Sequence, residues 1–319
     1  MMRLFSNADA RLEELPEGSS LTDAVWIDIC DPSDADRAAV AALGTTLPSF
    51  DEMRQIEVSS RLFRAGRVDH MTVFLLGPTA PKSGVERVFP VTFVLSSERL
   101  VTIRYHSPRP FETYPAHAAT SAAGCGSATR VMLGLLEEVV GRQADRMEEI
   151  GDSLDGLLAS VLEDQPDRRP KKLSGVMRTL GIQGEKLTRL HLGLVSLERL
   201  LSFYRRVHVS EEAELVDIAA GVQHDIKALI ELSEFVSDRI SFATDLILGL
   251  ISVDQNTTMR IFSIITGLFM PPTLIASMYG MNFSGMPELD SPWGYPVTLC
   301  VMAGSSILAY LIFKWRRWI

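Results

Sequence analysis

The sequence has few cysteines and no recognisable pattern among its histidines. The 319-residue chain contains three cysteines, Cys30, Cys125 and Cys300, which lie far apart. This usage indicates neither a disulfide framework nor a zinc knuckle, and it fits a reducing compartment. The six histidines show no metal-ligand spacing, and there is no Gly-x-Ser-x-Gly elbow or glycine-rich phosphate loop. These absences argue against a disulfide-rich secreted protein and against the common hydrolase and nucleotide-binding motifs.

The N-terminus lacks the apolar core of a secretory signal, and basic residues are fewer than acidic ones. Charged residues make up 22% of the chain and the mean hydropathy is only +0.14, so most of it is expected to be cytoplasmic and water-soluble. Only four of 31 basic and three of 40 acidic residues lie beyond residue 250, which leaves the first 250 residues with a net charge of −10. This acidity argues against nucleic acid as a partner. Cation binding and ordinary solubility explain it equally well.

Two stretches near the C-terminus have no charged residue. Residues 261–279 and 295–313 are each 19 residues long, close to the roughly 20 that a membrane span requires. Arg260 precedes the first stretch and Lys314 follows the second, whereas the link between them has no lysine or arginine. The positive-inside rule then predicts that both termini are cytoplasmic and that the link lies on the far side of the membrane.

The rest of the chain predicts an α+β cytoplasmic domain with a long helical stalk. β-branched and aromatic residues favour strands at residues 24–29, 68–76, 88–95 and 100–105. Helical patterns cover residues 130–164 and 171–206, with a break at 166–170. We therefore divide the chain into an α/β domain at 1–125, a stalk at 126–255 and a transmembrane hairpin at 256–319, with a pore helix at 256–279 and a second span at 295–313.

The last helical pattern is unusually long. No proline occurs between residues 211 and 270, so the pattern continues from the soluble part into the first span. A helix of roughly 65–70 residues would be on the order of 100 Å long at 1.5 Å per residue. A helix of that length needs partners along its sides, which predicts a bundle or an oligomer.

A polar stripe follows one face of the membrane end of this helix. From Ser252 onward, alternating spacings of four and three select only hydroxyl, amide and thioether side chains. These predicted pore-lining residues are Asn256, Met259, Ser263, Thr266, Met270, Thr273 and Ser277, with Phe262 beside them as an apolar constriction that could gate by dewetting. The alternative is that the hydroxyls bond back to their own helix and the small residues only permit close packing.

Continuing towards the N-terminus in steps of seven from Ser252 gives a mostly acidic row. Its carboxylates, candidate ligands of a regulatory metal, are Asp217, Glu231, Asp238 and Asp245, with His224 among them. Carboxylates brought together across an oligomer would bind divalent cations, which prefer oxygen ligands. A helix drifts about 20° per heptad from a 3.5 repeat, so the row could turn into a subunit interface. A solvated acidic face is the plainer alternative.

The link between the spans carries the clearest motif. Tyr279-Gly280-Met281-Asn282 is followed by Met286-Pro287-Glu288-Leu289 and Gly294-Tyr295-Pro296, and Phe269-Met270-Pro271-Pro272-Thr273 precedes them within the first span. In order and spacing these residues resemble the CorA family of magnesium and cobalt channels. Val25-Trp26-Ile27-Asp28 and Ile56-Glu57-Val58-Ser59-Ser60-Arg61 are similar to the family as well, so the resemblance covers the whole chain.

The resemblance implies a funnel-shaped homopentamer in the bacterial inner membrane that passes Mg²⁺, and also Co²⁺ or Ni²⁺, inward and downhill under control by cytosolic Mg²⁺. No cofactor is implied beyond Mg²⁺ itself, as substrate and regulatory ligand, and the partners are other copies, lipid and divalent cations. Gly280, Met281 and Asn282 would form the selective outer mouth, where Glu288 and Asp290 would concentrate cations. Asn256, Met259, Met270 and Thr273 match the family's pore-lining positions, Phe262 stands at its aliphatic neck, and Asp245 falls near an acidic ring.

Three other interpretations stay open. A zinc transporter similar to the ZntB branch is the nearest, although that branch usually carries isoleucine where Met281 stands. A membrane-tethered enzyme is a second, but the missing catalytic motifs give it little support. A purely structural coiled-coil scaffold would explain the long helices and leave the link motif without a purpose.

Overall fold

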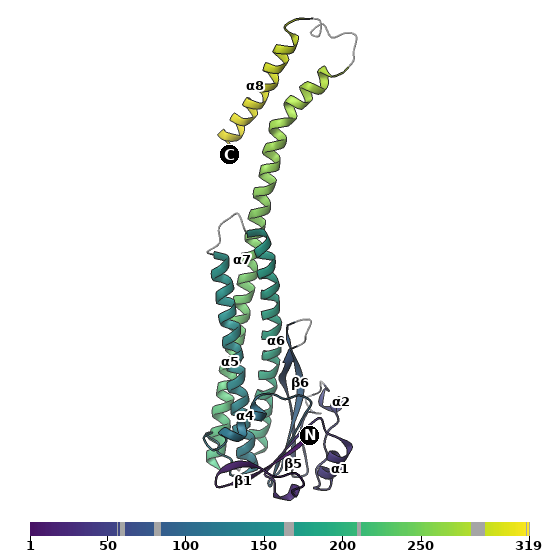
Figure 1. Cartoon of the computed structure of the whole chain (residues 1–319). Coiled ribbons are helices and arrows are strands. Elements are labelled where there is room, and N and C mark those ends of the chain that lie inside the picture. The colour runs from purple at the N-terminus through teal and green to yellow at the C-terminus, as the bar shows by residue number, and fades with distance from the viewer. Residues whose placement is uncertain are drawn as a thin grey trace. The chain divides into compact units, whose positions relative to one another are not determined.

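The computed structural model describes residues 1–55, 57, 61–79, 84–162, 169–208, 212–281, 291–316 and 318 (Figure 1). Two compact units are present, Met1–Thr244 and Asp245–Ile319. The proposed division into three parts at residues 125 and 255 stays an interpretation of the sequence.

The first unit contains a seven-stranded sheet with the order β2-β1-β3-β7-β6-β5-β4. Neighbouring strands are antiparallel except for β3 and β7, which pair in parallel with Trp26 opposite Leu100. The four strands predicted from the sequence are present as β3 (Trp26–Cys30), β5 (Val68–Thr79), β6 (Glu86–Leu95) and β7 (Leu100–Arg104). Three further strands were not predicted from the sequence: β1 (Met2–Ala8), β2 (Arg11–Glu14) and β4 (Leu62–Ala65). Strands β2 and β4 lie at the two edges of the sheet, and β1 lies next to β2.

Each face of this sheet is covered by helices because the buried side chains alternate along the strands. In β3, Trp26 joins the core on one face, whereas Ile27 and Ile29 join the core on the other. The first core also includes residues of α4 (Pro110–His117), α5 (Ala128–Leu162), α6 (Arg169–Val207) and α7 (Ala213–Tyr279), and the second includes residues of α1 (Asp34–Ala41) and α2 (Phe50–Met53). Figure 1 shows the long helices and the pair α1 and α2 on opposite sides of the sheet.

The long helices confirm the helical patterns of the sequence. Two of them, α5 and α6, lie within two residues of the predicted ranges at both ends, and α7 is continuous over 67 residues. A 22-residue helix, α8 (Gly294–Trp315), follows later in the chain. Both α7 and α8 contain a window that is long and apolar enough to cross a membrane, and neither window has a buried residue.

Burial along α7 changes abruptly. In the first unit α7 buries Leu215, Ala219, Val222 and Ile226, at the spacings of four and three that place residues on one helix face. The pattern continues to Ile247, and no described residue of α7 beyond it is buried. The first part of α7 therefore packs into the core of the first unit. The last part exposes apolar side chains, which lipid or another copy of the chain would have to cover.

Candidate functional site

The predicted pore stripe lies on an open side of α7. All eight predicted pore-lining residues are exposed. Half-buried positions instead occupy the side that contains Gly267 and Leu268, both of which contact α8. At 100° per residue, the stripe lies about 140° around the helix from that side. The stripe thus lies away from α8 of the same chain. A surface that faces other copies across an aqueous path would have to be uncovered in this way.

Two hydroxyls of the stripe bond within their own helix. Ser263 Oγ donates to the Met259 carbonyl oxygen at 2.9 Å, and Thr273 Oγ1 donates to the Phe269 carbonyl oxygen at 2.7 Å. This satisfies each hydroxyl proton and leaves the oxygen lone pairs able to accept hydrogen bonds. Bonds of this kind are expected if the stripe only packs against other helices. They are equally compatible with a pore, because the hydroxyl oxygen can still accept a hydrogen bond from water. The pore-lining assignment stays a prediction.

The predicted outer mouth begins where α7 ends. The Gly280 N–H donates to the Ala276 carbonyl oxygen at 2.9 Å, which keeps the chain in a helical turn at this point. A Cβ on Gly280 would lie 3.2 Å from the same oxygen, so glycine relieves crowding here. Met281 is exposed. Asn282, Glu288 and Asp290 lie outside the described residues, and their roles in selectivity and cation attraction stay predictions.

The acidic row is solvent-facing. Asp217, Glu231 and Asp238 are exposed on the part of α7 that belongs to the first unit, and Asp245 is exposed at the start of the second. Within the parts of the chain that the structure describes, no three or more histidine, cysteine, aspartate or glutamate side chains are grouped closely enough to hold a metal ion. The regulatory metal site therefore stays a prediction for this row.

A buried charge network, which the sequence analysis did not identify, holds the middle of the sheet. The carboxylate of Asp28 in β3 is almost fully buried and accepts hydrogen bonds from Arg104 Nη2 at 2.9 Å, Arg3 Nη2 at 3.0 Å and Thr102 Oγ1 at 2.9 Å. Trp26 Nε1 donates to Thr102 Oγ1 at 3.0 Å. A carboxylate between two guanidinium groups fixes the pairing of β1, β3 and β7. No buried polar side-chain atom of Asp28, Thr102, Trp26 or Arg104 lacks a hydrogen-bond partner, so we interpret the network as structural.

A second buried carboxylate joins the sheet to the end of α6. Asp69 in β5 contacts His208 Nε2 at 2.6 Å and Arg64 Nε at 2.7 Å. Burial acts to raise the pKa of Asp69, but the hydrogen bonds from His208 and Arg64 outweigh it, so the pKa lies below its usual value. Asp69 is therefore ionised at neutral pH and serves as an acceptor.

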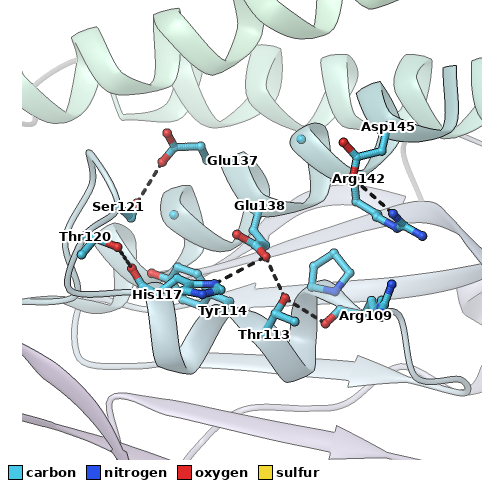
Figure 2. A pocket seen from close by; sticks show the side chains of 13 residues that line it. Arg109, Thr113, Tyr114, His117, Thr120, Ser121, Glu137, Glu138, Arg142 and Asp145 are labelled. Atoms are coloured by element: carbon cyan, nitrogen blue, oxygen red, sulfur yellow. Dashed lines mark hydrogen bonds and ion pairs between the residues drawn. The ribbon is translucent and has the colours of Figure 1, made fainter. Parts of the chain in front are cut away.

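A cavity of about 560 Å³ lies between α4 and α5 and contains none of the predicted site residues (Figure 2). Its charged side chains mostly pair with other lining groups. Glu138 Oε1 accepts from Thr113 Oγ1 at 2.7 Å, and Glu137 Oε2 accepts from Ser121 Oγ at 2.9 Å. Arg142 pairs with Asp145 one turn further along α5. The cavity is therefore a polar pocket of the first unit.

Comparison with known proteins matches the chain over nearly its whole length. The family described as CorA-like Mg²⁺ transporter protein matches residues 22–316. The chain is 32% identical over 319 residues to the magnesium transport protein CorA of Salmonella typhimurium, covering 99% of this chain and 98% of that one. It is 31% identical over 322 residues to the protein of the same name from Haemophilus ducreyi, covering 100% of both.

Solved structures share the fold. The complete CorA magnesium transporter from Methanocaldococcus jannaschii aligns with a TM-score of 0.76 at 19% identity, over 100% of this chain and 99% of that one. The cytoplasmic domain of ZntB from Vibrio parahaemolyticus aligns with a TM-score of 0.57 at 10% identity, over 77% of this chain and 96% of that domain. The ZntB domain thus shares the fold of the first unit, and the full-length match extends through the two apolar helices.

Proposed function

The chain belongs to the family of CorA-like Mg²⁺ transporter proteins, with two C-terminal membrane spans, and we propose that it conducts Mg²⁺ down its electrochemical gradient. The observation that carries the proposal is the full-length similarity to proteins named for magnesium transport. The open polar stripe of α7 supports it, because it offers hydroxyl, amide and thioether groups along a segment of spanning length.

The proposed path needs several copies of the chain. One α7 presents one polar stripe, and a closed aqueous path requires such stripes to surround an axis. We assign five copies, as the resemblance to the family implies. Arg260 before the first span and Lys314 at the end of α8 favour the cytoplasmic side for both termini, with the link on the opposite side.

Selectivity is assigned to a ring of Asn282 amides. Mg²⁺ loses its water reluctantly and usually keeps several water ligands. Amide carbonyls can accept hydrogen bonds from those waters without stripping the ion, whereas a ring of carboxylates would hold the ion tightly and slow its release. Entry is then driven by the membrane potential, at about 2.3 kcal/mol per charge per 100 mV and twice that for a divalent ion.

Control by cytosolic Mg²⁺ is assigned to the acidic row of α7. Exposed carboxylates on neighbouring copies repel one another when no cation lies between them. Bound Mg²⁺ would offset this repulsion and hold the helices together, so that the apolar constriction at Phe262 stays dry. Loss of the ion would let the helices separate and the constriction fill with water.

A liposome flux assay tests the proposal. The purified full chain is reconstituted into vesicles that contain a Mg²⁺-sensitive dye, and an inward Mg²⁺ gradient is applied with a negative interior potential. We expect dye-reported Mg²⁺ entry that rises with the potential. Competition by Co²⁺, Ni²⁺ and Zn²⁺ then ranks the ions: Zn²⁺ entry with no Mg²⁺ entry would overturn the proposal in favour of a zinc transporter.

A further inference from the structure

Two adjacent prolines interrupt hydrogen bonding inside the proposed pore helix. Pro271 and Pro272 lie within α7 and have no N–H to donate. The carbonyl groups four residues earlier, at Gly267 and Leu268, therefore lose their usual partners in the helix. In a membrane an unpaired carbonyl is costly because no water is available to satisfy it. The stripe residues Met270 and Thr273 flank this weak point.

A hydroxyl from α8 reaches one of these two carbonyls. Ser306 Oγ donates to the Leu268 carbonyl oxygen at 3.4 Å. Several other hydroxyls of the two spans bond to their own helices. Ser305 Oγ, for example, donates to the Met302 carbonyl oxygen at 2.7 Å, and Thr298 Oγ1 donates to the Gly294 carbonyl oxygen at 2.9 Å. Ser306 differs from them, because its hydroxyl bonds from α8 to α7. The carbonyl that it reaches, that of Leu268, is one that Pro272 leaves without its partner within the helix.

The neighbouring residue of α7 is contacted by the same face of α8. A Cβ built on Gly267 would lie 2.5 Å from Cζ of Phe313, so the phenyl ring occupies the space that any other residue at 267 would need. Phe313 lies seven residues after Ser306, two turns along α8 on the same face. Both residues whose carbonyls the prolines release are thus contacted by α8.

We propose that Ser306 and Phe313 are positioning residues that clamp the proline break of α7 and thereby set the placement of Met270 and Thr273 in the pore. The clamp itself rests on contacts within one chain. Its effect on ion flow rests on the proposed function. Without the clamp, the part of α7 beyond the prolines is free to pivot, and the two stripe residues no longer share one direction.

The first experiment is a double-mutant cycle on Ser306 and Pro272. Ser306→Ala removes the donor, and Pro272→Ala restores an N–H that bonds Leu268 within the helix. Because the hydroxyl contact is long at 3.4 Å, we expect a modest effect. Amides 273–276 should exchange hydrogen about threefold faster in Ser306→Ala, in line with typical side-chain hydrogen bonds between membrane helices. In a Pro272→Ala background, the Ser306→Ala change should have no effect.

Ser305→Ala is the matched control, because Ser305 bonds only within α8 in the described contacts. Exchange is measured on the full chain in lipid nanodiscs, and Mg²⁺ flux on the same variants in vesicles, where Ser306→Ala should lower the rate about threefold. Equal exchange in Ser306→Ala and Ser305→Ala would overturn the clamp, as would an effect of Ser306→Ala that persists in the Pro272→Ala background. If the unmodified chain carries no Mg²⁺, the proposed function fails while the exchange data still decide the clamp.

The second experiment addresses the ring contact. Gly267→Ala should push the Phe313 ring away and lower Mg²⁺ flux. The double variant Gly267→Ala, Phe313→Leu should recover most of the loss, because a smaller side chain leaves room for the added methyl. Gly249→Ala is the control, since nothing lies within 4 Å of a Cβ at Gly249. Two outcomes would contradict the role of Phe313: equal Mg²⁺ flux in Gly267→Ala and Gly249→Ala, or a loss of flux in Gly267→Ala that Phe313→Leu does not reverse.

Discussion

The two parts of α7 follow different rules although they form one continuous helix. In the first unit the helix buries a regular apolar face within the core that it shares with α5 and α6. Beyond Ile247 no described residue of α7 is buried, and large apolar residues such as Met259 and Phe269 are 65% and 61% exposed. The same secondary structure is thus stabilised by its own chain in one unit and left for lipid and other copies to cover in the other.

Polar groups show the same contrast. In the first unit the buried carboxylate of Asp28 pairs with Arg3 and Arg104, and that of Asp69 pairs with His208, all from distant parts of the chain. In the second unit hydroxyls such as Ser263 and Thr273 bond to their own helix and point outward. The first arrangement fixes a fold within one chain. The second leaves acceptor oxygens available to an aqueous path.

The largest expected effect separates conduction from folding. Asn282→Ala should reduce Mg²⁺ flux in vesicles to background, because it removes the amide ring that receives the hydrated ion. Assembly, followed by size-exclusion chromatography, and thermal unfolding of the soluble unit should stay unchanged. Normal flux in this variant would refute the filter assignment.

Next in size is a change that should act on folding alone. Asp28→Asn leaves Arg3 and Arg104 without a full negative partner in a buried site, and breaking a buried ion pair costs about 3–5 kcal/mol. Denaturant unfolding of the full chain in detergent would measure the loss in free energy of unfolding. Asp225→Asn, at an exposed position of α7, is the control and should stay within about 0.5 kcal/mol. Similar values for both variants would show that the network contributes little.

The soluble unit should also lose stability in acid through His106. This ring is buried against Phe89, and burial, together with the positive charge of Arg104, lowers its pKa to about 4. The unfolded chain takes up the proton first as pH falls below about 6.5, so stability should fall from there to pH 4 by about 1.4 kcal/mol per unit, roughly 3 kcal/mol in all.

Measuring the free energy of unfolding against pH in the full chain and in His106→Leu tests this effect. Between pH 6 and 4.5, the slope of the free energy of unfolding against pH should be smaller in the variant by about 1.4 kcal/mol per pH unit, which corresponds to one proton. Identical slopes would mean that His106 is not protonated on unfolding. Mg²⁺ flux is not expected to follow the same titration, because His106 lies in the first unit and outside the proposed path.

The smallest effect is expected for the acidic row. Neutralising Asp217, Glu231, Asp238 and Asp245 together should raise the internal Mg²⁺ concentration needed for half-inhibition by about tenfold, a typical coupling between sites. Stability should change little because all four side chains are exposed. Asp225→Asn, off the row, should leave inhibition unchanged. Inhibition that is unaffected by the fourfold change would place the sensor elsewhere.

Much of the fold could be predicted because its signals are local. Strands β5, β6 and β7 carry runs of β-branched and aromatic residues, and α5 and α6 are bounded by breaks that the sequence displays. The edge strands β2 and β4 have four residues each, too few for a periodic pattern to stand out. Strand β2 is fixed by pairing with β1, and β4 by pairing with β5. Such pairing depends on two segments together, so neither segment predicts it alone.

The candidate site divides in the same way. The stripe from Asn256 to Ser277 could be predicted because helical spacing alone places residues on one face. The partners of Asp28 could not, since Arg104 lies 76 residues away and only the register of β3 against β7 brings it near.

The sequence by itself determined the two spans, the link motif and the family resemblance, because length, charge and residue order are read directly from the chain. The sequence also predicted a continuous α7, from the absence of proline over most of its length. Only the tertiary structure decided that the stripe faces away from α8 and that Ser306 meets the carbonyl freed by Pro272. Those contacts depend on how two helices lie against each other. Helix periodicity predicts which residues share a face, but it does not predict which element packs against that face.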